Sequence, residues 1–130
     1  MPHFGRSSKE KRNTCDPRLQ EVLDEAIKHV DFSIIWGHRD MEEQNSAFKA
    51  GRSRNRWPTS KHNAYPAKAF DIVPYPGGYE ASTEKFYELA SYVLAAASEK
   101  GISLKWGGHW KNYTGKGEND RDWAHFEKID

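Results

Sequence analysis

The chain has 130 residues and a formal net charge of +1; 36% of its residues are hydrophobic, 13% aromatic and 30% charged. This length suits one domain with one core, and the aromatic content argues against disorder. A charge so close to neutral creates no global field that attracts nucleic acid, so we expect no nucleic-acid partner. Because Cys15 is the one cysteine, an intramolecular disulfide and a site of several thiolates are both excluded.

Residues 1–15 form a polar, basic segment, which we expect to be an extended N-terminal arm ahead of a domain over 16–130. This segment lacks the hydrophobic core of a signal peptide. Nowhere does an apolar run approach the roughly 20 residues of a membrane span. We therefore expect synthesis in a cytoplasm, without an export signal or a membrane anchor.

The elements of the domain are predicted from its apolar periodicity and its stop signals. Asp16-Pro17 marks a helix start, because aspartate caps a helix and proline suits its first turn. In chain order we predict a helix over 17–30, a strand from 32 that ends at Gly37, a helix over 41–50, a loop over 52–61, a strand over 67–73, a helix from Ser82 to about 100, a strand over 102–106, a loop over 107–121 and a strand over 123–129. This order favours a single α+β domain, in which helices pack on a small antiparallel or mixed sheet.

Three residues form a candidate metal site: His62, Asp71 and His125. Two imidazoles and one carboxylate can hold a zinc ion and leave its fourth position open for water, as catalytic zinc sites do. The carboxylate of Asp122, three residues before His125, is placed to move protons for that water. These residues predict a small hydrolase with one Zn²⁺ ion.

Each of these assignments has an alternative. Lone histidines are more often surface or packing residues than ligands. Asp71 lies on an apolar strand, where an unpaired carboxylate is costly to bury, and its partner could be a metal, Arg39 or a backbone turn. Asp122 could belong to a solvated loop, and Glu118 could take its role.

Several motifs in a fixed order give the chain a more specific resemblance. They are Ser60-x-His62, Ala69-x-Asp71, Trp106-Gly107-Gly108 and Asp122-x-x-His125, together with the tract 37–44. The pattern resembles phage endolysins of the L-alanyl-D-glutamate peptidase type, in the D-Ala-D-Ala carboxypeptidase, lysostaphin and hedgehog-like group of zinc peptidases. It covers about residues 32–128. It departs in two places: His62 and Asp71 are nine residues apart where seven is usual, and His109 stands where an aspartate is common.

The resemblance implies a hedgehog- or DD-peptidase-like fold for the zinc peptidase domain over 16–130. It implies that the metal ligands are His62, Asp71 and His125, and that Asp122 is the catalytic base. Arg39 would bind a substrate carboxylate or support the oxyanion. The remaining candidate substrate contacts are Ser60, Gln44 and His109, of which His109 could instead be a surface residue or a competing ligand.

The implied reaction is hydrolysis of an amide bond in the stem peptide of peptidoglycan, between L-Ala and D-Glu. The implied protein is a monomeric phage endolysin, made in the host cytoplasm and acting on the cell wall in the periplasm after release. Removal of terminal D-Ala is the alternative reaction, and a non-enzymatic zinc-containing binding domain is the alternative class. The basic segments 6–12 and 52–61 are candidate contacts with an anionic envelope, or ordinary solvated charge.

Overall fold

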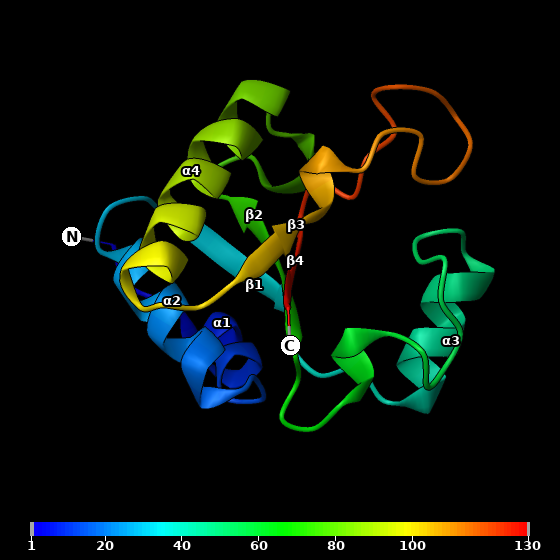
Figure 1. Cartoon of the computed structure of the whole chain (residues 1–130), viewed down its shortest axis with the longest axis horizontal. Coiled ribbons are helices and arrows are strands. Elements are labelled where there is room, and N and C mark those ends of the chain that lie inside the picture. Colours follow the sequence, from blue (N-terminus) through cyan, green and yellow to red (C-terminus); the bar gives the residue numbers. More distant parts are fainter. Residues whose placement is uncertain (1, 130) are drawn as a thin grey trace.

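The computed structural model describes residues 2–129 and contains nearly every predicted element (Figure 1). Its helices are α1 (Arg6–Arg12), α2 (Pro17–Ile27), α3 (Met41–Lys49) and α4 (Thr83–Glu99), and its strands are β1 (Phe32–Trp36), β2 (Ala69–Pro74), β3 (Leu104–Trp106) and β4 (His125–Lys128). Short 3₁₀ helices cover Lys61–Asn63, Gly78–Glu80 and Gly107–His109. The predicted helices and strands from residue 17 onward are confirmed, although α2 ends three residues before the predicted end and β4 is shorter than predicted.

The four strands form one antiparallel sheet in the order β1-β2-β4-β3. This agrees with the predicted α+β class and decides between an antiparallel and a mixed sheet. The register pairs Phe70 with Phe126 and Asp71 with His125 across the central strands. Because strand side chains alternate between the two faces, the aromatic pair and the polar pair lie on opposite faces of the sheet.

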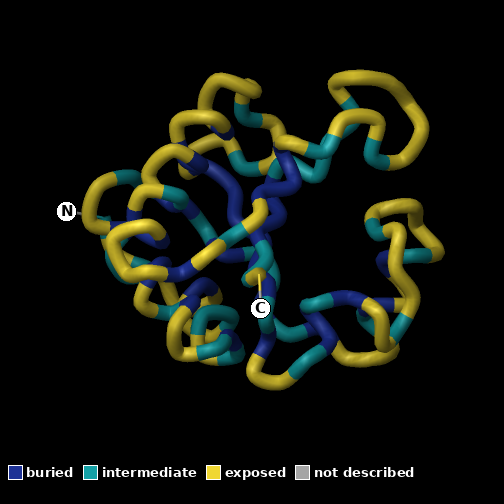
Figure 2. The backbone as a smooth tube through the Cα atoms, in the orientation of Figure 1, coloured by how far each residue is buried: buried dark blue, intermediate teal, exposed yellow. Residues whose placement is uncertain are grey.

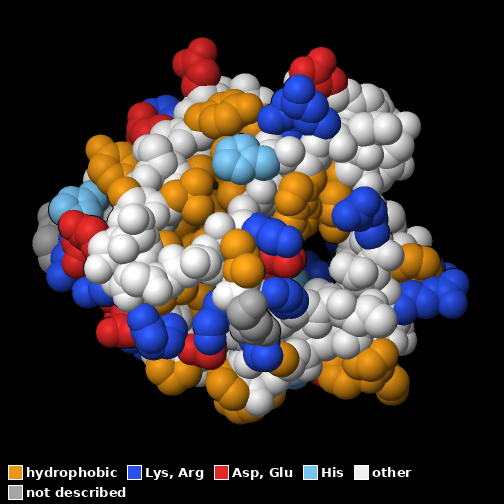
Figure 3. Space-filling model, viewed as in Figure 1, with side chains coloured by type: hydrophobic (Ala, Val, Ile, Leu, Met, Phe, Trp, Pro, Cys, Tyr) orange, Lys and Arg blue, Asp and Glu red, His pale blue; other side chains and the backbone are white. Residues whose placement is uncertain are grey.

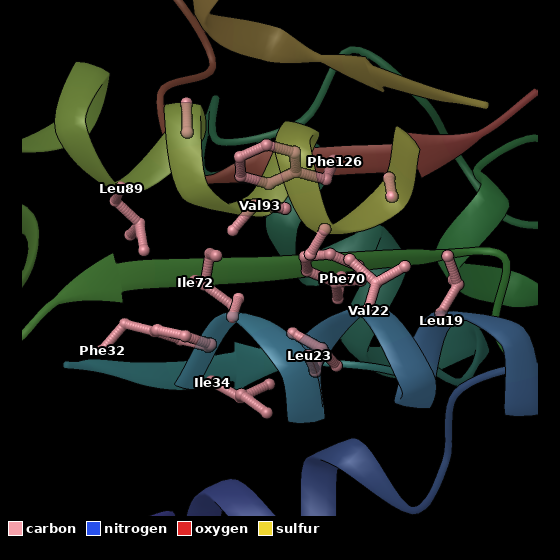
Figure 4. Packing of buried hydrophobic residues seen from close by; sticks show 14 of the residues in the cluster. Leu19, Val22, Leu23, Phe32, Ile34, Phe70, Ile72, Leu89, Val93 and Phe126 are labelled. Carbon is pink, nitrogen blue, oxygen red and sulfur yellow. The ribbon is translucent and has the colours of Figure 1, made fainter. Parts of the chain in front are cut away.

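The hydrophobic core lies between the sheet and the helices α2 and α4 (Figure 4). Helix α2 begins where the Asp16 carboxylate accepts a hydrogen bond from the Arg18 amide, 2.8 Å away. Its buried side chains recur at helical spacing: Leu19, Val22, Leu23, Ala26 and Ile27. Full burial of one such side chain contributes about 1.5–3 kcal/mol, so this stripe fixes α2 on the sheet.

The expectation of an extended segment at the N-terminus is wrong for Arg6–Arg12, which form helix α1. Here β1 is an edge strand, and the buried hydroxyl of Ser8 accepts a hydrogen bond from the Ile34 amide at 2.9 Å. Nearby, the ring of Phe4 packs edge-on against Phe32, with ring centres 5.4 Å apart. Helix α1 therefore covers a sheet edge that would otherwise expose unpaired amides.

Burial divides the molecule into two parts (Figure 2). Buried backbone is concentrated in the sheet and on the inner sides of α2 and α4, whereas α3 and the segments 50–61 and 107–121 are largely exposed. Figure 1 shows α3 and the loop over 107–121 standing apart from the helix-covered side of the sheet. Among residues 2–129, no helix combines the length and the apolar character needed to cross a membrane.

Candidate metal centre

Two of the predicted ligands lie opposite each other on the central strands. Asp71 on β2 and His125 on β4 are register partners, and Asp71 Oδ1 is 3.0 Å from His125 Nδ1. Their neighbours Phe70 and Phe126 stack on the opposite face with ring centres 5.4 Å apart. The hydrophobic core therefore anchors both strands directly behind the polar pair.

The third predicted ligand, His62, comes from the 3₁₀ helix that follows the loop over 52–61. Ser60 caps this helix, since its hydroxyl accepts a hydrogen bond from the His62 amide at 3.2 Å. His62 Nδ1 lies 2.7 Å from the carbonyl oxygen of Gly37. A carbonyl can only accept, so Nδ1 carries the hydrogen and Nε2 is left with a free lone pair. Gly37 must be a glycine, because a Cβ there would collide with Thr14 and the Lys11 carbonyl.

The three side chains converge on one point. His62 Nε2, Asp71 Oδ1 and His125 Nδ1 are 3.0–3.2 Å from one another. Ligands at about 2.0–2.2 Å from a tetrahedral zinc ion would lie roughly 3.4 Å apart. The outer nitrogens are also held, because His125 Nε2 lies 2.9 Å from Glu127 Oε1 just as His62 Nδ1 bonds Gly37. Such outer partners orient imidazole ligands, so this buried group can bind a metal ion.

The electrostatics of the cluster match that of a ligand set. Burial lowers the pKa of His62, which favours the neutral imidazole that binds metals. Burial opposes the charge of Asp71, but His62 and His125 outweigh it and hold the pKa of this carboxyl well below its usual range. Burial also opposes the charge of His125, yet hydrogen bonds with Asp71 and Glu127 raise its pKa to about 10. A cation therefore stabilises this cluster, and a metal ion would compete with the proton on His125.

Asp122 lies in the same cleft as the three candidate ligands. The cleft encloses about 380 Å³, and its lining includes Asp122 with all three ligands. The Asp122 amide donates to the Gly107 carbonyl at 3.2 Å, and a Cβ at Gly107 would collide with the Asp122 backbone. Burial and the nearby charge of Asp71 raise the Asp122 pKa to about 7, against smaller opposing effects of the positive charges of His125 and Arg39. A carboxyl with such a pKa can take up and return a proton near neutral pH.

Arg39 lies in the wall of the cleft and is only 6% exposed. One guanidinium nitrogen donates to Asp71 Oδ2 at 3.1 Å and another to Gln44 Oε1 at 3.3 Å. Arg39 therefore holds one oxygen of Asp71 while the other oxygen faces the histidines. Its Nε is buried and has no hydrogen-bond partner among the described residues.

The other predicted substrate contacts lie in different environments. Ser60 lines the cleft. Gln44 is fully buried outside the cleft lining, and its amide donates to the Asn55 carbonyl at 2.7 Å, so it supports the loop over 52–61. His109 is exposed, lies outside the lining and contacts the ring of Trp106 at 5.0 Å between centres. Glu118 is exposed and pairs with Lys111 at 3.6 Å.

Sequence reasoning missed three residues of the site: Glu127, Trp110 and Tyr113. The signal for Glu127 was available, since a residue two positions after His125 on a strand lies on the same face. The Trp110 ring lies 5.5 Å from the His125 ring and stacks on Tyr113 at 5.7 Å between centres. Both aromatic residues come from the loop over 107–121, where no apolar periodicity predicts which way a side chain points.

Comparisons with known proteins agree with this geometry. The model of a family described as phage L-alanyl-D-glutamate peptidase matches residues 2–129. Among solved structures, the crystal structure of the Serratia marcescens L-Ala D-Glu endopeptidase ChiX is similar, with 29% sequence identity and a TM-score of 0.76. The match covers 97% of this chain and 89% of that chain. No curated protein matches the sequence.

Proposed function

Since this chain belongs to the phage L-alanyl-D-glutamate peptidase family, we propose that His62, Asp71 and His125 hold a catalytic zinc ion. Family membership and the similarity to the Serratia endopeptidase make the chain a peptidoglycan peptidase of the phage endolysin type. One observation carries the zinc proposal: two imidazole nitrogens and one carboxylate oxygen converge at 3.0–3.2 Å beside Asp122 in a cleft.

The proposed reaction is hydrolysis of the amide bond between L-Ala and D-Glu. When bound, zinc supplies Lewis acidity that polarises the carbonyl and makes water a better nucleophile. Asp122 accepts a proton from the attacking water as the water oxygen bonds to the L-Ala carbonyl carbon. The carbon–nitrogen bond then breaks, and Asp122 returns the proton to the amine of D-Glu.

Arg39 has a double role in this proposal. Its bond to Asp71 Oδ2 orients that carboxylate, so that Oδ1 points toward the two histidines. Its positive charge beside the cleft also stabilises the negative charge that develops on the carbonyl oxygen. An Arg-to-Lys change would remove the planar fork that allows both contacts at once.

We also propose that the enzyme is a monomer with one zinc ion, made in the host cytoplasm and acting on the wall from the periplasm. The substrate is the stem peptide, and the site needs no residue from a second copy. Ser60, which lines the cleft beside His62, is the proposed substrate contact that the geometry supports best.

The experiment that tests this function uses purified peptidoglycan, with mass spectrometry of the released fragments before and after chelation and zinc restoration. Fragments with a new D-Glu amino terminus, lost on chelation and regained with zinc, are the expected result. Release of D-Ala alone would indicate a carboxypeptidase instead. Hydrolysis that persists in fully metal-free protein would refute the zinc proposal.

A further inference from the structure

The metal centre lies where two adjoining clefts of different character meet. The first cleft, of about 380 Å³, holds the ligands, and its basic lining residues are Arg39, Arg52, Arg54, Lys61 and Lys105. The second cleft, of about 540 Å³, has aromatic walls formed by Trp36, Tyr79, Phe86 and Trp123, and its lining also includes the basic residues Arg39, Arg52, Lys116 and Arg121. Both clefts are lined by Arg39, Arg52, Asp71, Tyr113 and Asp122, so Arg52 lies where they meet. A peptide whose scissile bond lies at Asp122 therefore has on one side the first cleft, which alone contains Arg54, and on the other side the cleft with aromatic walls.

Two arginines of the first cleft, Arg52 and Arg54, differ from the arginines of the packed body. On the body, Arg6, Arg12 and Arg18 each pair with a carboxylate, at 3.8, 2.6 and 3.4 Å. Within residues 2–129, Arg52 and Arg54 have no carboxylate partner. Figure 3 shows Lys and Arg side chains gathered around a hollow on this face of the molecule. Charges left unpaired around a concave site attract an anionic ligand.

One of these arginines is fixed in the cleft that also contains the proposed base. The Arg54 guanidinium lies over the Tyr113 ring at 4.3 Å from its centre, and both residues line the first cleft together with Asp122. This stacking holds a guanidinium in the same cleft as the proposed base. Stacking of this kind reduces the freedom that an arginine loses on binding.

The substrate carries a carboxylate at the matching position. The D-Glu amine is the leaving group, one of its two carboxyl groups carries the next residue of the stem peptide, and the other carboxyl is free. We propose that Arg52 and Arg54 bind this free carboxylate of D-Glu, so that the acidic part of the peptide fills the basic cleft and the L-Ala side faces the aromatic cleft. The enzyme then discriminates against peptides whose D-Glu carboxyl is amidated. This inference rests on the proposed function of the same site.

The test compares two synthetic tripeptides, L-Ala–D-Glu–diamino acid, with the free glutamate carboxyl either left intact or converted to its amide. Binding is measured by calorimetry on zinc-loaded Asp122→Asn protein, so that no substrate is consumed. The acid should bind roughly tenfold or more tightly than the amide, because a charge-assisted bidentate contact is lost with the amide. Arg52→Gln and Arg54→Gln, added to this variant, should shrink the ratio toward one.

The matched control is Arg56→Gln in the same segment. Arg56 stacks on Phe48 at 4.6 Å and lines neither cleft, so its substitution removes the same charge but should keep the preference for the acid. Equal binding of acid and amide, or an equal effect of all three substitutions, would overturn the inference. Wild-type protein that cuts neither peptide while the acid still binds preferentially would instead count against the proposed hydrolysis.

Discussion

The packed body and the rim of the cleft contribute differently to the site. The body consists of the sheet with α2 and α4, whose contact surfaces are buried and largely apolar. The rim consists of segments 50–61 and 107–121, which are mostly exposed. Asp71 and His125 belong to the body, whereas Arg54 and Tyr113 belong to the rim. Groups that must keep a fixed geometry are on strands, and groups that meet a variable substrate are on loops.

This difference explains how so small a chain can hold a buried polar cluster. Phe70 and Phe126 secure the two strands from the core side, so the backbone positions of Asp71 and His125 do not depend on the rim segments. His62 is the exception, because it follows a rim segment and is fixed by Ser60 and the Gly37 carbonyl. We therefore expect substitutions in the two regions to separate stability from catalysis.

The largest expected effect comes from Asp122→Asn, which removes the proposed base at the boundary of the two regions. Loss of a general base should lower kcat by about 10²–10⁴-fold, while the three ligands and bound zinc remain. Hydrolysis of peptidoglycan and zinc content per chain are the two measurements. Glu118→Gln is the matched control, since it removes a carboxylate of the same loop that is exposed and outside the cleft. Unchanged hydrolysis in Asp122→Asn, or an equal loss in Glu118→Gln, would remove Asp122 from the mechanism.

A substitution in the core should damage the body alone. Leu23 is fully buried on α2, so Leu23→Ala should lower the free energy of unfolding by about 2–5 kcal/mol. Zinc affinity and kcat of the folded fraction should stay close to wild type, because Leu23 lies on the far side of the sheet from the metal centre. Denaturant unfolding of the metal-free protein measures the loss, with exposed Glu21→Ala as the control. A large fall in kcat at low temperature would show that the two regions are coupled.

Substitution of Glu127 tests whether a residue of the body affects the zinc affinity of the metal centre without binding the metal itself. Its carboxylate bonds His125 Nε2 at 2.9 Å, so Glu127→Ala should weaken zinc binding by about 10–100-fold. Glu127→Gln keeps an acceptor oxygen and should recover much of this loss. Competition titration with a zinc chelator measures the affinity directly. Equal affinities for wild type and Glu127→Ala would mean that Glu127 serves packing only.

Much of the body could be predicted from the sequence, because its patterns have physical causes. Helix α2 was predicted from its N-cap residue and its apolar stripe. Strands β2 and β4 were predicted from the alternation of side chains between the two faces of a strand. Asp71 stood out as an acid on an apolar strand. Its pairing with His125 required the sheet order, which periodicity does not supply, so their proximity rested on the resemblance.

The rim and the N-terminus could not be predicted in this way. Helix α1 has no apolar stripe, and it is held by Ser8 against the edge of β1. Tyr113 reaches the cleft because of the path of the loop over 107–121, which is rich in glycine and charged residues. No local sequence pattern predicts that path. Gln44 was a candidate substrate contact on a polar helix, yet it is fully buried and supports the loop over 52–61.

The smallest expected effect is a pH dependence that belongs to the boundary residue Asp122. Burial raises its pKa to about 7, so the unprotonated form that accepts a proton is lost as the pH falls through that value. For a pKa near 7, the unprotonated fraction falls about threefold between roughly pH 7.5 and 6.5. A bound zinc cation favours the carboxylate, so the loaded enzyme should show this acidic limb of kcat/KM at a somewhat lower pH. The residual activity of Asp122→Asn should lack the limb, and a limb unchanged by this substitution would assign the titration to another group.

The raised pKa also means that the Asp122 carboxylate destabilises the metal-free fold at pH 8, so Asp122→Asn should then unfold at a higher temperature than wild type. That advantage should vanish toward pH 4, where the carboxyl is protonated in the folded protein and increasingly in the unfolded chain. A residue that weakens the apo fold and is needed for hydrolysis is what a catalytic carboxylate held in a half-buried cleft should be.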